Sequence, residues 1–345
     1  MTPSPSGFEQ DIQRVYRKKM KGVADEISSD VHGNTVAVLN PKGSVRVMLA
    51  GHCDQIGMMV THIDERGYIY FKAIGGIDPT VVPGTHLKIL TEKGELPAII
   101  GYKPIHLVDR SDRGKKLDLD DLWIDIGAEN GKEAKKLVSV GDPVVYQPQI
   151  TKLGKHQISG PGLDDRVGLY VVSEAMRLVA KEIKGKKSFP VALFGVSTVQ
   201  EEIGLRGART SCYGVDPDVG IAVDVTHATD NPGANPKKVG DVKLGKGPTI
   251  ARGANVNPIL EGILKSAAKK KKIAYQTLSA PRATGTDANA MQISRDGVAT
   301  ALIGLPNRYM HTQVEVCDTR DLDAAAELIA ATVMEIKAKT SFIPS

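Results

Sequence analysis

The stretch RVMLAGHCDQIGMMV, residues 46–60, decides how this sequence is interpreted. Its apolar run stops at Gly51, and His52, Cys53 and Asp54 follow before apolar residues resume. A nearly continuous apolar run is typical of a strand that is buried on both faces of a parallel sheet. An imidazole and a carboxylate two residues apart at its end fit either a turn with a satisfied polar pair or a site of chemistry. The rest of the chain has to decide between the two.

The composition is that of a soluble globular protein with one large domain or two ordinary ones. The chain has 345 residues, of which 41% are hydrophobic and 25% charged. The net charge of +5 is modest for this length, and the densest basic run, Lys269 to Lys272, has no interleaved aromatic residues. We therefore expect no nucleic-acid partner.

The cysteines and the N-terminus indicate the compartment. The three cysteines are odd in number and far apart, and no CxxC spacing is present, which argues against a disulfide framework or a cysteine metal site. The N-terminal segment has no apolar signal region, and no apolar run approaches the roughly 18 residues of a membrane span. We expect a cytoplasmic protein with no membrane contact.

Strands and helices alternate along most of the chain. Four apolar runs, at residues 45–50, 190–199, 219–223 and 298–305, predict buried strands of the parallel type. Three segments place apolar residues at helical spacing on one face, at 165–183, 258–271 and 322–337. This alternation predicts an α/β fold in which helices cover both faces of the sheet.

The stretch from 58 to 150 has a different character. It contains short β-like pieces, such as GYIYFKAI, HLKILT, LPAIIGY and DPVVYQP, between turn signals such as Gly75-Gly76. Only residues 131–137 suggest a helix. We therefore predict a small all-β module, residues 58–150, inserted into an α/β domain made of residues 1–57 and 151–345.

Acidic residues and histidines stand just after the predicted strands or, in one case, at the start of a predicted helix. In chain order they are His52, Asp54, Asp164, Glu201, Glu202, Asp224 and His311. The carboxyl ends of parallel strands meet at one edge of a sheet, which is where such folds place their chemistry. We therefore expect these residues to form one constellation.

This set of side chains suits a pair of divalent metal ions. Crowded carboxylates repel one another and take up protons unless cations neutralise them. Imidazole together with carboxylate suits zinc, cobalt or manganese. A two-metal centre needs one bridging carboxylate and terminal ligands for each ion. This number of ligands is supplied by His52, Asp164, Glu202, Asp224 and His311. Glu201 is then left over beside the metals, as a general base requires.

Each residue taken alone has an ordinary structural alternative. Asp164 could cap a helix, and Glu201-Glu202 could be a solvated strand end. The sequence contains no GxGxxG, GxxxxGK[ST], GxSxG or HExxH motif, which disfavours nucleotide-binding enzymes, nucleophile-elbow serine hydrolases and helical zinc proteases. Of the remaining histidines, which we interpret as structural or surface residues, His227 stands closest to the set.

Six segments of the chain resemble the M42 metallo-aminopeptidases, the tetrahedral aminopeptidases of the co-catalytic zinc exopeptidase clan. They are GHCDQIG, GPGLDDRVG, STVQEEIGLRGA, VDVTHATD, GTDANAMQISRDGVAT and LIGLPNRYMHTQVE, in the order and approximate spacing of the family. The resemblance implies a mixed sheet and the hydrolysis of N-terminal peptide bonds. It also implies that the inserted module mediates dimers, which assemble into a tetrahedral dodecamer.

The resemblance also implies a role for each candidate residue. One metal ion would be held by His52 and Asp224, a second by Glu202 and His311, with Asp164 as the bridge. Zinc is the first expectation, with cobalt or manganese as alternatives. The peptide bond after Asp164 would be cis, as in related enzymes. Glu201 would be the general base, Asp54 would orient the His52 imidazole from behind, and Asp287 is a candidate for the substrate pocket.

The sequence departs from the family at Gln55, where glutamate is usual, and this bears on the local charge near the first metal. Cys53 is interpreted as a small buried filler. Two other functions stay open at this stage. Some family members carry glucanase labels, so a glycoside hydrolase is one alternative, although such enzymes need no histidines at strand ends. An inactive assembly scaffold is the other. The preferred N-terminal residue is left open.

Overall fold

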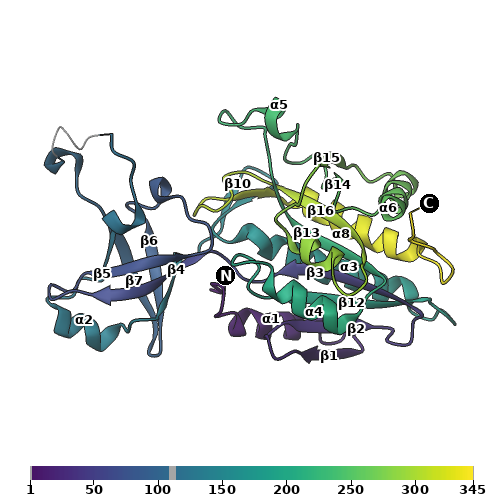
Figure 1. Cartoon of the computed structure of the whole chain (residues 1–345), viewed down its shortest axis with the longest axis horizontal. Coiled ribbons are helices and arrows are strands. Elements are labelled where there is room, and N and C mark those ends of the chain that lie inside the picture. Colours follow the sequence, from purple (N-terminus) through teal and green to yellow (C-terminus); the bar gives the residue numbers. More distant parts are fainter. Residues whose placement is uncertain (1, 109–113, 345) are drawn as a thin grey trace.

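The computed structural model describes residues 2–108 and 114–344 of the chain. Figure 1 shows a large α/β part and, set beside it, a smaller β part. The chain enters the smaller part after β3 (Val45–His52) and leaves it after β9 (Pro143–Tyr146). The β part is therefore inserted into the α/β part, and the two are in contact where the chain crosses.

The four strands predicted from apolar runs lie side by side at the centre of an eight-stranded sheet. In spatial order they are β12 (Val191–Thr198), β3, β13 (Val219–His227) and β16 (Ala299–Asn307), and they run parallel. The sheet is mixed because its flanking strands, β2 (Thr35–Leu39) and β14 (Thr249–Gly253), run antiparallel to β12 and β16. The edges are β1 (Glu26–Ser29) and β15 (Gln276–Ala280).

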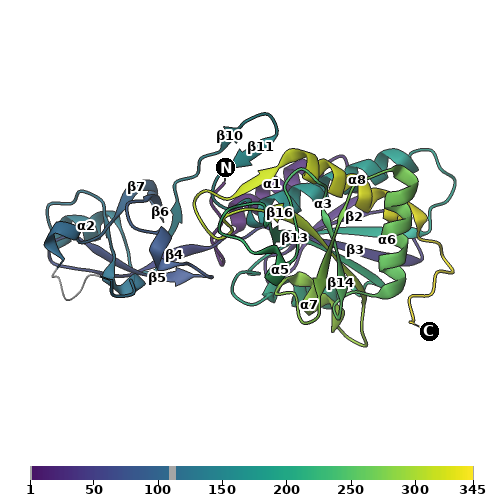
Figure 2. The same cartoon turned by 90° about the horizontal axis from the view of Figure 1, so that it is seen from above.

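Helices lie on both faces of this sheet, as Figure 2 shows from above. A side chain at Gly195 of β12 would meet Met176 of α3 (Leu163–Ile183) and Tyr16 of α1 (Gln10–Met20). A side chain at Gly220 of β13, on the opposite face, would meet Met291 of α7 (Asp287–Gln292). The first face also carries α8 (Thr319–Glu335) and α6 (Pro258–Lys271), and the second carries α4 (Arg206–Val215).

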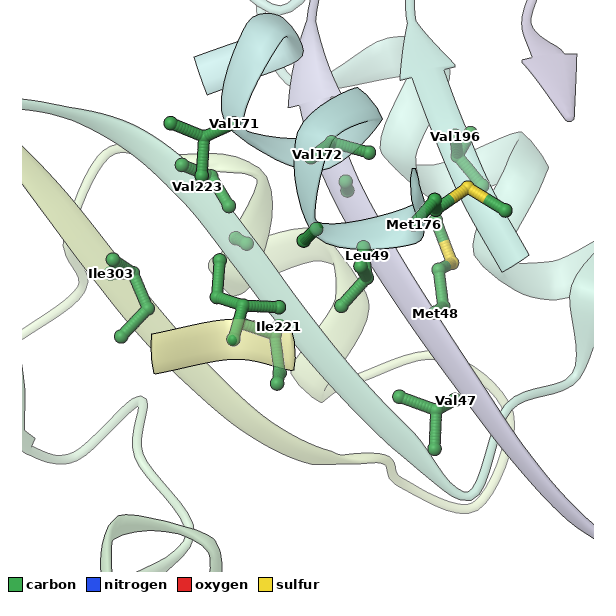
Figure 3. Close-up of a cluster of buried hydrophobic side chains, with 14 of the residues drawn as sticks. Val47, Met48, Leu49, Val171, Val172, Met176, Val196, Ile221, Val223 and Ile303 are labelled. Carbon is green, nitrogen blue, oxygen red and sulfur yellow. The ribbon is translucent and has the colours of Figure 1, made fainter. Parts of the chain in front are cut away.

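Aliphatic side chains fill the space between the sheet and α3 (Figure 3). Leu49 and Ile221 from the strands and Val172 from the helix are fully buried. β-Branched residues favour the strands because they pack well on a pleated surface. Burying each large apolar side chain contributes about 1.5–3 kcal/mol to the free energy of folding. The packed sheet can therefore support the residues at its edge.

The inserted part is a closed barrel with its own apolar core. Its strands, in spatial order, are β4 (Gly57–Ile63), β5 (Ile69–Ile74), β8 (Trp123–Asp125), β7 (Gly94–Gly101), β6 (His86–Thr91) and β9. In a closed barrel each strand has a neighbour on both sides. The helix expected at 131–137 is present as α2 (Gly131–Leu137), and short 3₁₀ turns occur at Pro79–Val81, Ile105–Leu107 and Leu119–Asp121.

Smaller elements complete the α/β part. A three-stranded sheet joins β10 (Thr151–Leu153), β11 (Gln157–Ser159) and β17 (Val316–Asp318), and α5 (Pro236–Val239) is a single turn. None of the helices in the described residues is both long and apolar enough to cross a membrane.

Three strands end later than the sequence predicts: β3, β13 and β16. The extensions of β3 and β13 change the place of two site residues. β3 continues to His52, which is therefore its last residue. β13 continues to His227, so Asp224 lies inside the strand and not after it. The pairing of β13 with β3 stops at Ala222, whereas its pairing with β16 goes on to His227. Asp224 consequently lies where β13 no longer pairs with β3 but still pairs with β16.

Candidate functional site

The Asp164 carboxylate lies between the two imidazoles that the sequence singles out. Its Oδ1 is 3.0 Å from Nε2 of His52, and its Oδ2 is 3.3 Å from Nε2 of His311. Nε2 of His311 is also 3.4 Å from Oε2 of Glu202. Nε2 of His52 is 3.9 Å from Oδ1 of Asp224. The five predicted metal ligands therefore meet at one place.

The backbone at Asp164 turns its carboxylate into this cluster. Asp164 and Asp165 have non-helical dihedral angles, and the peptide bond between them is cis. Among the described residues, no backbone N–H of α3 donates to the Asp164 carboxylate, whereas that of Gly168 donates to Asp165 at 3.0 Å, so Asp164 does not cap the helix. Both aspartates are buried, at 5% and 0% exposure. The structural alternative of a helix cap is therefore wrong.

Both histidines have their other ring nitrogen fixed by a backbone carbonyl. Nδ1 of His52 is 3.1 Å from the carbonyl oxygen of Asp54, and Nδ1 of His311 is 2.9 Å from that of Gly76. A carbonyl oxygen only accepts, so each Nδ1 donates a proton and each Nε2 is turned toward Asp164. This arrangement selects the tautomer that a metal ligand needs.

The Asp54 carboxylate holds the turn that carries Glu201 and Glu202. It accepts hydrogen bonds from the backbone N–H of Glu201 at 3.0 Å and of Glu202 at 3.2 Å, and from the Ser6 hydroxyl at 2.6 Å. Its Oδ1 is 3.5 Å from Nδ1 of His52. Asp54 is thus close to the imidazole, as expected, but its strongest contacts position the Glu201-Glu202 backbone.

Three buried carboxyl groups that the sequence did not single out support the site. Glu315 accepts from the backbone N–H of Asp164 and of His311, both at 3.0 Å, so it joins two ligand-bearing segments. Glu9 accepts from the N–H of Gln200 at 3.2 Å. Asp165 accepts from the N–H of Gly168 at 3.0 Å. The only sequence signal for Asp165 and Glu315 is their position inside the motifs already quoted, and Glu9 lies outside all of them.

Asp165 extends the set of candidate ligands. Ligand atoms of His52, Asp165 and Asp224 lie close enough together to hold one ion, and those of His52, Asp164 and Glu202 form a second such group. The Oδ2 atom of Asp165 and the Oε1 atom of Glu202 are buried and have no hydrogen-bond partner among the described residues. Unpartnered buried carboxylate oxygens are costly, and a bound cation would satisfy them.

The carboxyl groups of the cluster have raised pKa values, as crowded buried carboxyl groups do. Burial, followed by the charges of nearby carboxylates such as Asp224, raises the pKa of Glu201 to about 10. Burial and the neighbouring Asp164 raise the pKa values of Glu202 and Asp224 to about 8 each. The hydrogen bond to Asp164 raises the pKa of His311 to about 9. Divalent cations would reverse these shifts, so the residues fit a metal centre.

A cavity of about 600 Å³ opens onto the cluster. Besides the five ligands and Glu201, its lining includes Leu205, Thr226, His227, Thr284 and Met310. Asp287 is not among the described residues that line it. That carboxylate is 3% exposed and accepts from the Thr198 hydroxyl at 2.6 Å, while its neighbours Gly285 and Thr286 face the cavity.

Gln55 lies in a buried polar network behind the site. Its side-chain oxygen accepts from the guanidinium of Arg166 and from the backbone N–H of Ser4. Arg166 also donates to the carbonyl oxygens of Thr2 and Gly162. Gln55 therefore gives this arginine a neutral partner. Cys53 is fully buried and accepts a hydrogen bond from the Gln13 amide at 3.4 Å, which agrees with a packing role.

Comparisons with known proteins agree over nearly the whole chain. A model of the family described as M42 glutamyl aminopeptidase matches residues 33–328. The lysyl aminopeptidase of Pyrococcus furiosus is 42% identical over 342 residues, which cover 97% of this chain and 95% of that protein.

Solved structures give the same family. The crystal structure of a TET aminopeptidase from a marine sediment archaeon, Thaumarchaeota archaeon, is 32% identical with a TM-score of 0.91, and covers 97% of this chain and 93% of its own. The TET1 peptidase of Pyrococcus horikoshii, which can assemble into a tetrahedron or a large octahedral shell, is 32% identical with a TM-score of 0.85 and covers 97% of each chain.

Proposed function

This chain belongs to the M42 aminopeptidase family, and for its peptide hydrolysis we propose a centre of two divalent metal ions at the Asp164 cluster. The observation that carries the proposal is the Asp164 carboxylate, whose two oxygens face two different imidazole nitrogens at 3.0 and 3.3 Å. One carboxylate placed between two histidines is the arrangement that a bridging ligand requires.

The ligands divide into two groups around Asp164. His52 and Asp224 would hold one ion, and Glu202 and His311 the other, with Asp165 within reach of the first group. Such ions, when bound, supply Lewis acidity that polarises a peptide carbonyl and makes water acidic near neutral pH. Zinc, cobalt and manganese all suit this mixture of nitrogen and oxygen ligands, and we propose zinc first.

Glu201 is the general base in this proposal. Its side chain lines the cavity, and its Oε2 is 3.8 Å from Nε2 of His52, so it stands beside the ligands. The carboxylate accepts a proton from the attacking water and delivers it to the amine that leaves. The Asp54 carboxylate keeps Glu201 in place through the backbone N–H of that residue.

The cavity lining favours some N-terminal residues over others. Outside the six site residues and His227, the described lining residues are uncharged and include Leu205, Thr284 and Met310. These described lining residues include no lysine or arginine that could pair with an acidic side chain of a substrate. We therefore expect glutamyl substrates to be cleaved more slowly than leucyl or lysyl substrates, although the family model is described as glutamyl aminopeptidase.

A panel of aminoacyl chromogenic substrates tests this proposal. The metal-stripped protein is assayed with leucyl, lysyl and glutamyl substrates after Zn²⁺, Co²⁺ or Mn²⁺ is added back. Hydrolysis that returns only with metal is the expected result. Full activity in the stripped protein, with metal analysis confirming removal, contradicts the metal centre.

The alternatives are less well supported. The family model and the Pyrococcus furiosus relative both carry aminopeptidase names, which favours the peptidase over a glycoside hydrolase. An inactive scaffold would lack at least one ligand, and all five candidate ligands are present at the cluster. The cytoplasmic location stays a prediction.

We also propose that the barrel is the surface through which copies of this chain associate, as the assembly of the TET1 relative suggests. Its side chains Ile105 and Leu107 are 57% and 65% exposed. Replacing both with aspartate should lower the molar mass measured by light scattering after size exclusion. An unchanged mass contradicts this role, and a mass of twelve chains for the wild type supports a dodecamer.

A further inference from the structure

The inserted barrel reaches into the metal-ligand cluster through the turn at Gly75-Gly76. This turn follows β5, which belongs to the barrel at the left of Figure 1. Gly76 lines the cavity, and its carbonyl oxygen accepts a hydrogen bond from Nδ1 of His311 at 2.9 Å. The two residues are 235 positions apart in the sequence. The contact therefore exists only because the barrel docks against the α/β part.

The hydrogen bond to Gly76 determines which nitrogen of His311 is free. Since the carbonyl cannot donate, Nδ1 carries the proton and Nε2 of the neutral ring presents its lone pair. That nitrogen faces Oδ2 of Asp164 at 3.3 Å and Oε2 of Glu202 at 3.4 Å. Hydrogen bonds of this kind orient a ligating imidazole and increase its basicity.

The space around the turn gives independent support. A Cβ atom at Gly76 would lie 3.2 Å from Nδ1 and 3.5 Å from Cε1 of the His311 ring. At Gly75, which has a φ of 76°, a Cβ atom would lie 2.9 Å from Cγ2 of Ile56 and 3.3 Å from Cβ of Glu202. The backbone of the turn thus lies directly against two of the candidate ligands, and a Cβ atom at Gly76 would require the His311 ring to shift by a few tenths of an ångström.

His311 needs this outside support because its own segment holds the ring weakly. It lies four residues beyond the end of β16, has a φ of 62°, and its side chain is 36% exposed. Glu315 accepts a hydrogen bond from the backbone N–H of His311 at 3.0 Å, which fixes the main chain of His311 but not its ring. Besides the ligand cluster itself, the Gly76 carbonyl is the described group that fixes the ring's rotation.

We propose that Gly76 is a positioning residue of the metal centre, which acts through His311 and makes the inserted barrel part of the active site. The inference rests on the proposed function, because it assumes that His311 and Glu202 hold a metal ion. A purely structural role for the barrel would leave metal binding unchanged when this contact is disturbed.

Metal titration of a Gly76→Ala variant tests the proposal. Its φ lies outside the left-handed region, so alanine disturbs the His311 ring and not the local backbone. We expect one of the two metal equivalents to bind about 10–100-fold more weakly, measured by calorimetric titration of the metal-stripped protein with Zn²⁺ or Co²⁺. Gly262→Ala, in α6 with open space around its Cβ, is the matched control and should bind as the wild type does.

A double-mutant cycle separates positioning from folding. In a His311→Ala background, Gly76→Ala should add little further loss of metal affinity, because the group it acts through is gone. Additive losses overturn the proposal, as does a Gly76→Ala variant that binds both equivalents within about two-fold of the wild type. Unfolding of Gly76→Ala that persists in the His311→Ala background, seen by circular dichroism, also overturns it. Wild-type protein that binds no metal refutes the proposed function itself.

Discussion

His52 and His311 present the same ring nitrogen to the same carboxylate, but they are supported in different ways. His52 ends a central strand, its side chain is 2% exposed, and its Nδ1 is fixed by a carbonyl two residues away. His311 stands on a loop, is 36% exposed, and depends on a carbonyl from the inserted barrel. One half of the proposed centre is therefore held by local structure and the other by the docking of two parts of the chain.

Removal of divalent metal should have the largest effect, because it empties both halves at once. We expect dialysis against a chelator to abolish peptide hydrolysis and re-addition of Zn²⁺, Co²⁺ or Mn²⁺ to restore it. The rate of leucyl-substrate hydrolysis, measured with metal content, checks this. Dialysis without chelator is the control, and undiminished turnover after chelation would contradict it.

The Glu201→Gln variant should lose activity and leave both halves intact. Since the amide cannot accept the proton from water, we expect kcat to fall by at least ~10²-fold while both metal equivalents stay bound. Steady-state kinetics and metal analysis on the same sample measure this. Glu182→Gln, at an exposed position near the end of α3, is the control. Wild-type kcat in Glu201→Gln would rule out its role as the base.

Asp54→Asn should weaken the His52 half and the Glu201-Glu202 turn together. The carboxylate accepts from the N–H of Glu201 and Glu202, and its Oδ1 is 3.5 Å from Nδ1 of His52, so loss of one acceptor oxygen disturbs a candidate ligand in each half. We expect metal affinity to fall about 10–100-fold at both equivalents, in contrast to the single equivalent affected by Gly76→Ala. Calorimetric titration measures this, with the exposed Asp296→Asn as control. An effect confined to one equivalent would contradict this assignment.

Ser6→Ala should have the smallest effect, since it removes one of the hydrogen bonds to Asp54 and leaves the others. The hydroxyl donates to a buried carboxylate at 2.6 Å, so its loss should lower the free energy of unfolding by about 1.5–3 kcal/mol. Urea denaturation of the metal-free protein measures this, with the exposed Ser44→Ala for comparison. Equal stability of both variants would show that Ser6 contributes nothing.

The central strands and the candidate ligands were largely predictable. Apolar runs located the four central strands. The rule that chemistry lies at strand ends selected His52, Glu202, Asp224 and His311, and Asp164 stood at the start of a predicted helix; all five meet in the structure. Even so, Asp224 lies inside β13, because the pairing with β16 extends the strand beyond its apolar run. Hydrophobic periodicity records burial and not strand pairing.

The supporting residues were not predictable in this way. Glu315, Glu9 and Asp165 are carboxyl groups without a distinctive pattern, and they matter because the fold buries them against particular backbone N–H groups. Gly76 appeared in the sequence only as a turn signal, and its contact with His311 spans 235 residues.

Local pattern alone thus determined the central strands, several helices and the candidate ligands. Burial leaves apolar runs and helical spacing in the sequence, and polar residues that follow an apolar run mark the end of a strand. Tertiary structure decided how those ligands are oriented. Their orientation depends on hydrogen bonds between segments that are distant in sequence, such as the one between Gly76 and His311. The acceptor in that bond is a backbone carbonyl, which every residue type carries. The residue type at position 76 therefore does not predict this hydrogen bond.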